Sequence, residues 1–203
     1  MHNFSALARS LESKATSTKR KAIIFFIIPA IFIALWIAVV LLYQFRFGNK
    51  SDTKHSIFYL IQIFAKSSSF NDFKETFNAL KMEVKIYLGL LLLLSVSILI
   101  MGFVLPIVLM ISISGLKEIN RKISSIPILS LDTQALAKSA TSNLSAANVL
   151  IGFGFIIPIL TFIGVILALV GSSKTKAVSQ DILWNLQVNQ LAQNANNSNG
   201  VYY

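Results

Sequence analysis

Side chains that could carry chemistry are almost absent from the apolar stretches of this sequence. Membrane enzymes and ion-coupled transporters usually hold ionisable groups inside their spans. The three longest apolar stretches, 22–45, 86–111 and 149–171, contain none. The deepest polar side chains in them are the hydroxyls of Ser95, Ser97 and Thr161. Because such hydroxyls commonly hydrogen-bond to their own helix, we expect no catalytic or transport site in these stretches.

The remaining reactive residue types also lack a recognisable pattern. The two histidines, His2 and His55, lie far apart in sequence and have no partner spacing for catalysis or metal binding. There is no cysteine, which excludes a disulfide framework and a thiolate metal site. Phosphate loops, dinucleotide fingerprints and nucleophile elbows are missing. We therefore expect a protein that is not an enzyme and binds neither a cofactor nor a metal.

The composition is that of a multi-pass membrane protein. Of the 203 residues 55% are hydrophobic, and the mean hydropathy is +0.69. The net charge of +10 comes from basic residues that flank the apolar stretches. Anionic lipid headgroups are the nearer partner for such residues, so we expect contact with the lipid bilayer and none with nucleic acid.

The stretches predict an all-α membrane protein with three transmembrane helices, at 22–45, 86–111 and 149–171, because about 20 apolar residues cross a bilayer. Residues 1–21 precede the first span as a basic amphipathic segment. This segment could lie in the membrane interface, resemble a mitochondrial transit peptide, or form a frayed tail. The first span is longer than the core of a signal peptide, so we interpret it as an uncleaved anchor.

Two rows of small residues at four-residue spacing are candidates for helix packing. Such rows let helices approach closely in lipid. The rows are Ala30, Ala34 and Ala38 in the first span, and Gly164, Ala168 and Ser172 at the third. We expect the two rows to pack against each other or against another subunit.

The loop 46–85 contains amphipathic helices. Its second part carries an apolar row at heptad spacing, formed by Phe70, Phe73, Phe77, Leu80 and Val84. No proline or glycine lies between Phe70 and Tyr87, so we expect this helix to continue directly into the central span. The central helix would then extend beyond the bilayer on both sides.

Two further segments are expected outside the membrane. Residues 112–148 predict a helical hairpin between spans two and three, in which Leu116, Ile119 and Ile123 continue the apolar row of the central helix. Residues 172–203 predict a polar tail with a short amphipathic helix and a disordered end. Trp184, Val188 and Leu191 mark one face of that helix. We expect these apolar rows, with the heptad row of the loop, to contact partner subunits.

The distribution of basic residues decides the orientation weakly. Three spans divide the 18 Lys and Arg equally, with nine on each side. The cluster Lys19-Arg20-Lys21 touches the first span and places the N-terminus in the cytoplasm by the positive-inside rule. Three crossings would put the tail outside. We expect an integral membrane protein, with a bacterial inner membrane as the location.

These observations predict a non-enzymatic subunit of a larger multi-protein membrane assembly, acting by helix packing and scaffolding. A bacterial secretion or conjugation machine is one such assembly. The alternative is a homo-oligomeric pore or holin-like protein, which would join copies of the chain itself. A membrane enzyme or solute carrier would need a polar site at the bilayer midplane, formed by backbone groups freed at prolines.

Overall fold

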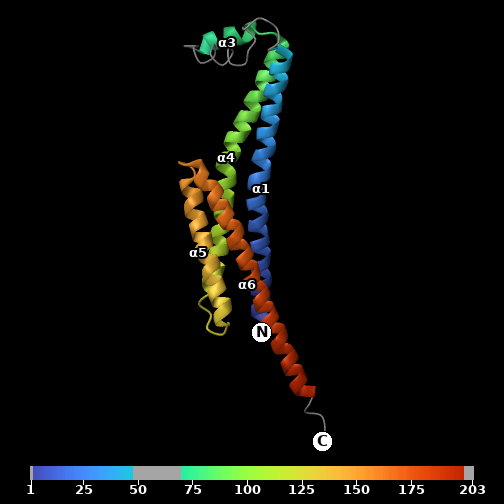
Figure 1. The fold of residues 1–203 in the computed structure, drawn as a ribbon, viewed down its shortest axis with the longest axis vertical. Helices are drawn as coiled ribbons and strands as arrows, with labels where there is room; N and C mark the ends of the chain where they lie inside the picture. The colour runs from blue at the N-terminus through green and yellow to red at the C-terminus, as the bar shows by residue number, and fades with distance from the viewer. Residues whose placement is uncertain (1, 48–69, 199–203) are drawn as a thin grey trace. The chain divides into compact units, whose positions relative to one another are not determined.

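The computed structural model describes residues 2–47 and 70–198, and the regular structure in these ranges is helical throughout (Figure 1). The helices in them are α1 (His2–Phe47), α3 (Phe70–Ala79), α4 (Met82–Ile123), α5 (Leu131–Phe153) and α6 (Pro158–Ser198).

Three of these helices are long and apolar enough to cross a bilayer: α1, α4 and α6. This confirms the predicted all-helical fold with three apolar helices of membrane-spanning length. The most apolar window has a mean hydropathy of 3.1 in α1, 2.8 in α4 and 1.6 in α6. Helix α6 is therefore the least apolar of the three.

The chain forms two compact units. The four-helix unit contains residues 1–26 and 103–203, and the two-helix unit contains residues 27–102. Helices α1 and α4 each contribute to both units, whereas α5 and α6 belong to the first and α3 to the second.

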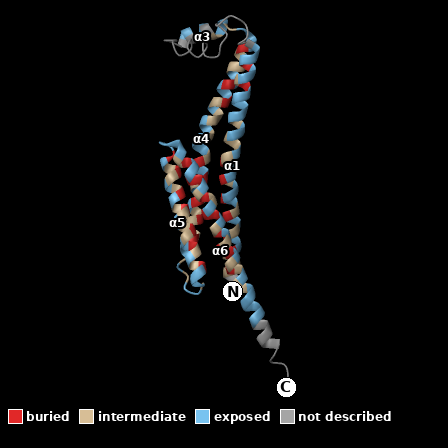
Figure 2. Cartoon of the chain, in the orientation of Figure 1, coloured by how far each residue is buried: buried red, intermediate tan, exposed pale blue. Residues whose placement is uncertain are grey.

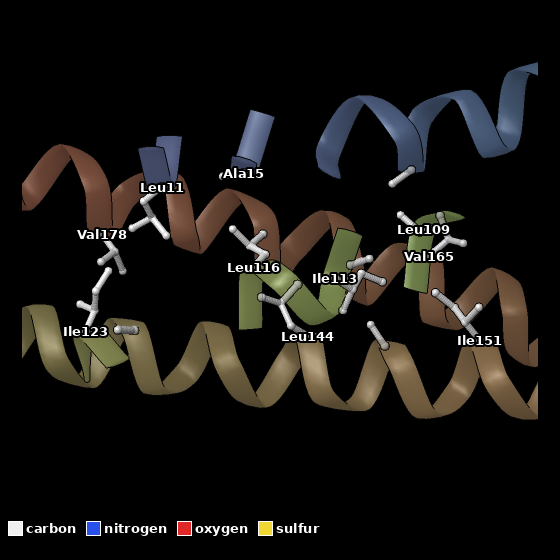
Figure 3. Packing of buried hydrophobic residues seen from close by; sticks show 14 of the residues in the cluster. Leu11, Ala15, Leu109, Ile113, Leu116, Ile123, Leu144, Ile151, Val165 and Val178 are labelled. Atoms are coloured by element: carbon white, nitrogen blue, oxygen red, sulfur yellow. The ribbon is translucent and has the colours of Figure 1, made fainter. Parts of the chain in front are cut away.

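The four-helix unit has a continuous apolar core (Figure 3). Each helix supplies fully buried residues at spacings of three or four, as an amphipathic helix requires. On α5 these residues are Thr133, Ala137, Ala140, Leu144, Ala147 and Ile151. Figure 2 shows the buried residues of α5 and α6 on their facing sides. Leu11 of α1, Leu116 of α4 and Val178 of α6 lie in the same cluster.

The two-helix unit is held by a smaller cluster between α1 and α4. Val39 and Tyr43 of α1 are buried against Val84, Leu91 and Leu94 of α4. The ring of Tyr43 meets that of Tyr87 edge to face, with centroids 5.7 Å apart.

The predicted continuity from Phe70 into the central span is wrong. Helix α3 ends at Ala79, and α4 begins at Met82 after a bend at Leu80 and Lys81. No proline or glycine causes this break. Leu80 packs on the cluster of Val39 and Tyr43. This packing stabilises the bend more than the local sequence pattern stabilises a continuous helix.

The predicted third span, 149–171, is not one helix. Helix α5 ends at Phe153, a turn covers residues 154–157, and α6 begins at Pro158. Proline suits the first helical position because it lacks an amide hydrogen, and it disfavours helical geometry in the residue before it. The turn joins α5 and α6 into a tight antiparallel hairpin.

The segments predicted at the two chain ends are parts of long helices. Residues 2–21 are the first turns of α1, and their Leu11 and Ala15 are buried in the core. They are therefore not a separate interfacial helix. The tail helix is continuous with α6 and lies beside the start of α1, where Ser179 contacts Ala8. The expectation that the tail lies on the opposite side of the membrane from the N-terminus stays a prediction, because the contact does not place either segment relative to a bilayer. Residues 199–203 lie outside the described part.

Candidate functional site

The α5–α6 hairpin is assembled through glycines. A methyl group added at Gly164 would lie 2.7 Å from Cγ1 of Ile151 and 2.9 Å from the carbonyl oxygen of Ala147. A methyl group at Gly171 would lie 2.8 Å from Cγ of Leu144. All three distances are shorter than van der Waals contact, so only glycine permits this approach. The two helices are packed along their length in the way that small residues allow.

A polar contact joins the ends of α4 and α6 inside the core. The amide nitrogen of Asn120 donates to Oγ1 of Thr175 at 2.7 Å and to the carbonyl oxygen of Leu116 at 3.1 Å. Thr175 donates in turn to the carbonyl oxygen of Gly171 at 2.9 Å. Asn120 and Thr175 are fully buried. Because an unmade hydrogen bond is costly in a buried place, this pair specifies how α4 and α6 align.

A second polar contact joins α1 to α4 at Lys21, the last charge before the apolar stretch of α1. Lys21 donates to Oγ of Ser112 at 3.1 Å, and Thr18 shares a hydrogen bond of the same length with that hydroxyl. Thr18 is buried. Beyond Lys21 the residues of α1 are uncharged as far as Arg46. The contact therefore lies where the charged first part of α1 meets its uncharged stretch.

The middle of α6 is tied to two other helices of the four-helix unit, α1 and α5. The Ser179 hydroxyl donates to the carbonyl oxygen of Ala8 at 2.7 Å, and both residues are buried. Asp181 accepts a hydrogen bond from Thr133 in the first turn of α5. Lys174 donates to Ser139, also on α5, at 2.8 Å. These contacts hold the N-terminal part of α1, the start of α5 and the middle of α6 together.

The exposed ion pairs of this unit are weaker features. Lys176 lies 3.7 Å from Glu12, and Lys122 lies 2.9 Å from Glu118 one turn earlier on α4. The hydrogen bond from Lys122 holds the pKa of the Glu118 carboxyl below its usual value. Exposed pairs of this kind contribute little to stability, so they indicate a surface in water and do not form a site.

The cavities of the four-helix unit are open surface clefts. One cleft, of about 490 Å³, is lined by α1 alone, with Arg9, Glu12 and Arg20 among its walls. A cleft of about 330 Å³ lies between α1 and α6 and has Lys19, Ser172 and Lys176 in its walls. Among residues 2–47 and 70–198, no three His, Cys, Asp or Glu side chains are grouped to hold a metal ion.

The two predicted packing rows have different environments. Gly164, Ala168 and Ser172 are used within the four-helix unit, where Ala168 and Ser172 are buried and Gly164 contacts α5. This row therefore packs within the four-helix unit, and its pairing with the alanine row or with another subunit stays a prediction. Ala30, Ala34 and Ala38 are exposed on α1.

Most of the residues predicted to contact partner subunits pack against other residues of this chain. Leu116 and Ile123 are fully buried and Ile119 is packed against them, while Val84 is buried and Leu80 packs beside it. Phe77 is half-buried, with the Lys85 ammonium 5.7 Å from its ring centre. The side chains of Phe70 and Phe73 lie outside the described part.

The last predicted group is the exception, because it is exposed. Trp184 is 62% accessible to solvent, Val188 43% and Leu191 61%. They follow each other at spacings of four and three and so share one face of α6. From residue 187 to residue 192 every side chain of α6 is exposed, so this end of the helix extends past the core of the four-helix unit.

Sequence reasoning missed the buried polar contacts. Asn120 stands four residues after Leu116 and three before Ile123, which places it on the buried face of α4. That spacing could have identified Asn120 as a core residue, whereas its partner Thr175 on another helix could not be found from spacing.

Comparisons with protein-family models, curated proteins and solved structures give no match to this chain.

Proposed function

We propose that this protein is a non-enzymatic integral membrane subunit of a larger multi-protein assembly. The observation that carries the proposal is the exposed row Trp184, Val188 and Leu191 on the projecting end of α6. A tryptophan in such a row is a frequent anchor of protein interfaces. After Asp181 the helix has no charged side chain, so its solvation is poor and a protein surface is the fitting partner.

The internal contacts of the four-helix unit support a scaffolding role. Its core is filled by apolar side chains, and Asn120, Thr175 and Ser179 make hydrogen bonds to other parts of the chain. A unit stabilised in this way can hold the end of α6 in one position. A bacterial inner-membrane secretion or conjugation machine is an assembly of the proposed kind, and a cytoplasmic N-terminus is the orientation that we propose.

The proposal is tested by isolating the tagged full-length protein from its own membrane in a mild detergent. Partner proteins that co-purify in a fixed ratio would support it. A complex made of this chain alone would favour the homo-oligomeric pore, which would also release a small dye from liposomes that contain the pure protein. A monomer without partners would contradict both.

A further inference from the structure

We propose that the α5–α6 hairpin is a re-entrant membrane element, which enters one leaflet, turns at residues 154–157 and leaves on the same side. The lipid acyl chains of that leaflet would surround its tip. Only α1 and α4 would then cross the bilayer, and both chain ends would share one side. This inference concerns membrane topology and holds whether or not the protein has partner subunits.

The polar boundary of the four-helix unit gives the level at which the bilayer begins. Lys21 and Thr18 of α1 meet Ser112 of α4, and the first charge that follows on α4 is Lys117. The α5 residue at this level is Asn148, whose amide donates to Ser114 at 3.3 Å. Residues of α5 after Asn148 and of α6 before Gly171 are uncharged and lie on the apolar side of this boundary.

The tip of the hairpin reaches only part of the way along α4. The Phe155 ring is stacked on that of Phe103, with centroids 5.9 Å apart. Phe103 is nine residues before Ser112, which corresponds to about 14 Å of helix at roughly 1.5 Å per residue. A hydrocarbon core is about 30 Å thick. The tip therefore lies near the middle of the bilayer.

The uncharged part of α6 is shorter than the uncharged parts of α1 and α4. It extends from Pro158 to Gly171, before Lys174 and Lys176. This is about 14 residues, a length more typical of a re-entrant or interfacial segment than of a span, which takes roughly 20. Near its middle, Phe162 stacks on Phe26 with ring centroids 5.9 Å apart. Phe26 is only five residues beyond Lys21, so this pair is also close to the boundary.

The turn is chemically suited to lipid. Its side chains are apolar, and Ile156 is 78% exposed. Each amide hydrogen of the turn is donated within the hairpin: Gly154 to Leu150, Phe155 to Gly152, and Ile156 and Ile157 to Phe153. Pro158 has no amide hydrogen to satisfy. Backbone groups in a bilayer must be satisfied internally because no water is available, and the donors of this turn meet that condition.

The charge distribution agrees with two crossings. The segments of the four-helix unit outside its apolar stretches hold five Lys and Arg in residues 1–21, four in 112–148 and two in 172–203. The loop 46–85 holds seven. Three crossings would place nine Lys and Arg on each side of the membrane. Two crossings would place eleven on one side and seven on the other. Positive residues favour the cytoplasmic side, so both ends of the chain would be cytoplasmic.

The chain has no cysteine, so single-cysteine variants can be labelled without background. The variants are Ser10→Cys, Leu131→Cys, Gln190→Cys, Glu75→Cys and Ile156→Cys, all at exposed positions. A membrane-impermeant maleimide is added to sealed membrane vesicles of each orientation that carry the full-length protein. Leu131 is the matched control for Ile156, because the two are 82% and 78% exposed.

We expect Ser10→Cys, Leu131→Cys and Gln190→Cys to be labelled from one side, and Glu75→Cys from the other. Ile156→Cys should be labelled from neither side until detergent dissolves the membrane. Labelling of Gln190→Cys from the same side as Glu75→Cys would overturn the inference in favour of three crossings. Labelling of Ile156→Cys in intact vesicles, from either side, would also overturn it. None of these outcomes depends on whether partner proteins co-purify.

Discussion

The Ser179 hydroxyl donates a hydrogen bond to the carbonyl oxygen of Ala8 at 2.7 Å, and both residues are buried. This contact joins residues 171 positions apart and brings the middle of α6 against the beginning of α1. It accounts for the arrangement of the four-helix unit, in which the middle of α6 packs beside the first turns of α1. It also supports the inference that both ends lie on one side of the membrane.

The first prediction concerns the close approach of α5 and α6. Gly164→Ala should destabilise the four-helix unit, because the new methyl group would meet Ile151 and the Ala147 carbonyl below 3 Å. Overpacking of this kind costs about 1–3 kcal/mol, which lowers a melting temperature by roughly 3–10 °C in a chain of this size. Thermal unfolding in detergent measures the effect.

The matched control is Gly115→Ala on α4. No atom lies within 4 Å of the added methyl group there, and alanine favours a helix interior over glycine. The melting temperature of this variant should be unchanged or slightly raised. Equal losses in the two variants would show that the steric contact at Gly164 does not hold the hairpin.

The second prediction concerns the buried pair Asn120 and Thr175. Asn120→Ala and Thr175→Val each remove one partner of the 2.7 Å hydrogen bond, and each should lower the free energy of unfolding by about 1–3 kcal/mol. The double variant should lose less than the sum of the two, because the second change no longer leaves a group unpaired. Ser97→Ala is the control, since Ser97 bonds only to the carbonyl of Leu93 on its own helix turn. Additive losses would contradict the pairing.

The third prediction uses the two tryptophans as reporters of environment. Trp36 lies within the apolar part of α1, where its indole nitrogen donates to Ser95 at 3.1 Å, whereas Trp184 lies past the charges of α6. In Trp184→Phe, lipids brominated on the acyl chains should quench the emission of Trp36 strongly. In Trp36→Phe, the same lipids should have little effect and aqueous acrylamide should quench Trp184. The reverse pattern would contradict the placement of α1 in the bilayer.

The fourth prediction concerns the exposed row on α6. The combined variant Trp184→Ala, Val188→Ala and Leu191→Ala should lose co-purifying proteins, because their side chains supply the proposed contact. Its melting temperature in detergent should stay within about 2 °C of the wild type, since exposed substitutions usually change stability by less than 0.5 kcal/mol. Leu131→Ala, at another exposed apolar residue, should keep the partners. Retention of every partner by the triple variant would reject this surface.

The helices themselves were predictable from the sequence, because long uncharged apolar runs and their basic flanks define them locally. The ends of the helices were not. The bend at Leu80 depends on packing against Val39 and Tyr43, which are distant in sequence. Pro158 did signal the start of α6, but a proline inside an apolar run also occurs in a continuous kinked span, as at Pro106 in α4.

The use of each apolar face was the least predictable feature. Leu116 and Trp184 both stand in amphipathic rows, but Leu116 is fully buried within its own chain and Trp184 is exposed. Periodicity shows that a face needs a partner and does not show which partner covers it. The antiparallel packing of α6 on α5 decides this, and it depends on the approach at Gly164.

The measurement that tests the central claim most directly is the mass of the native particle, released from the membrane in mild detergent and analysed together with its protein composition. We predict a particle much heavier than the 22.4 kDa chain, containing other proteins in a fixed ratio and lost in the triple variant of α6. A particle of 22.4 kDa, or a whole multiple of this mass with no other protein, would contradict the claim that the chain is a subunit of a hetero-assembly.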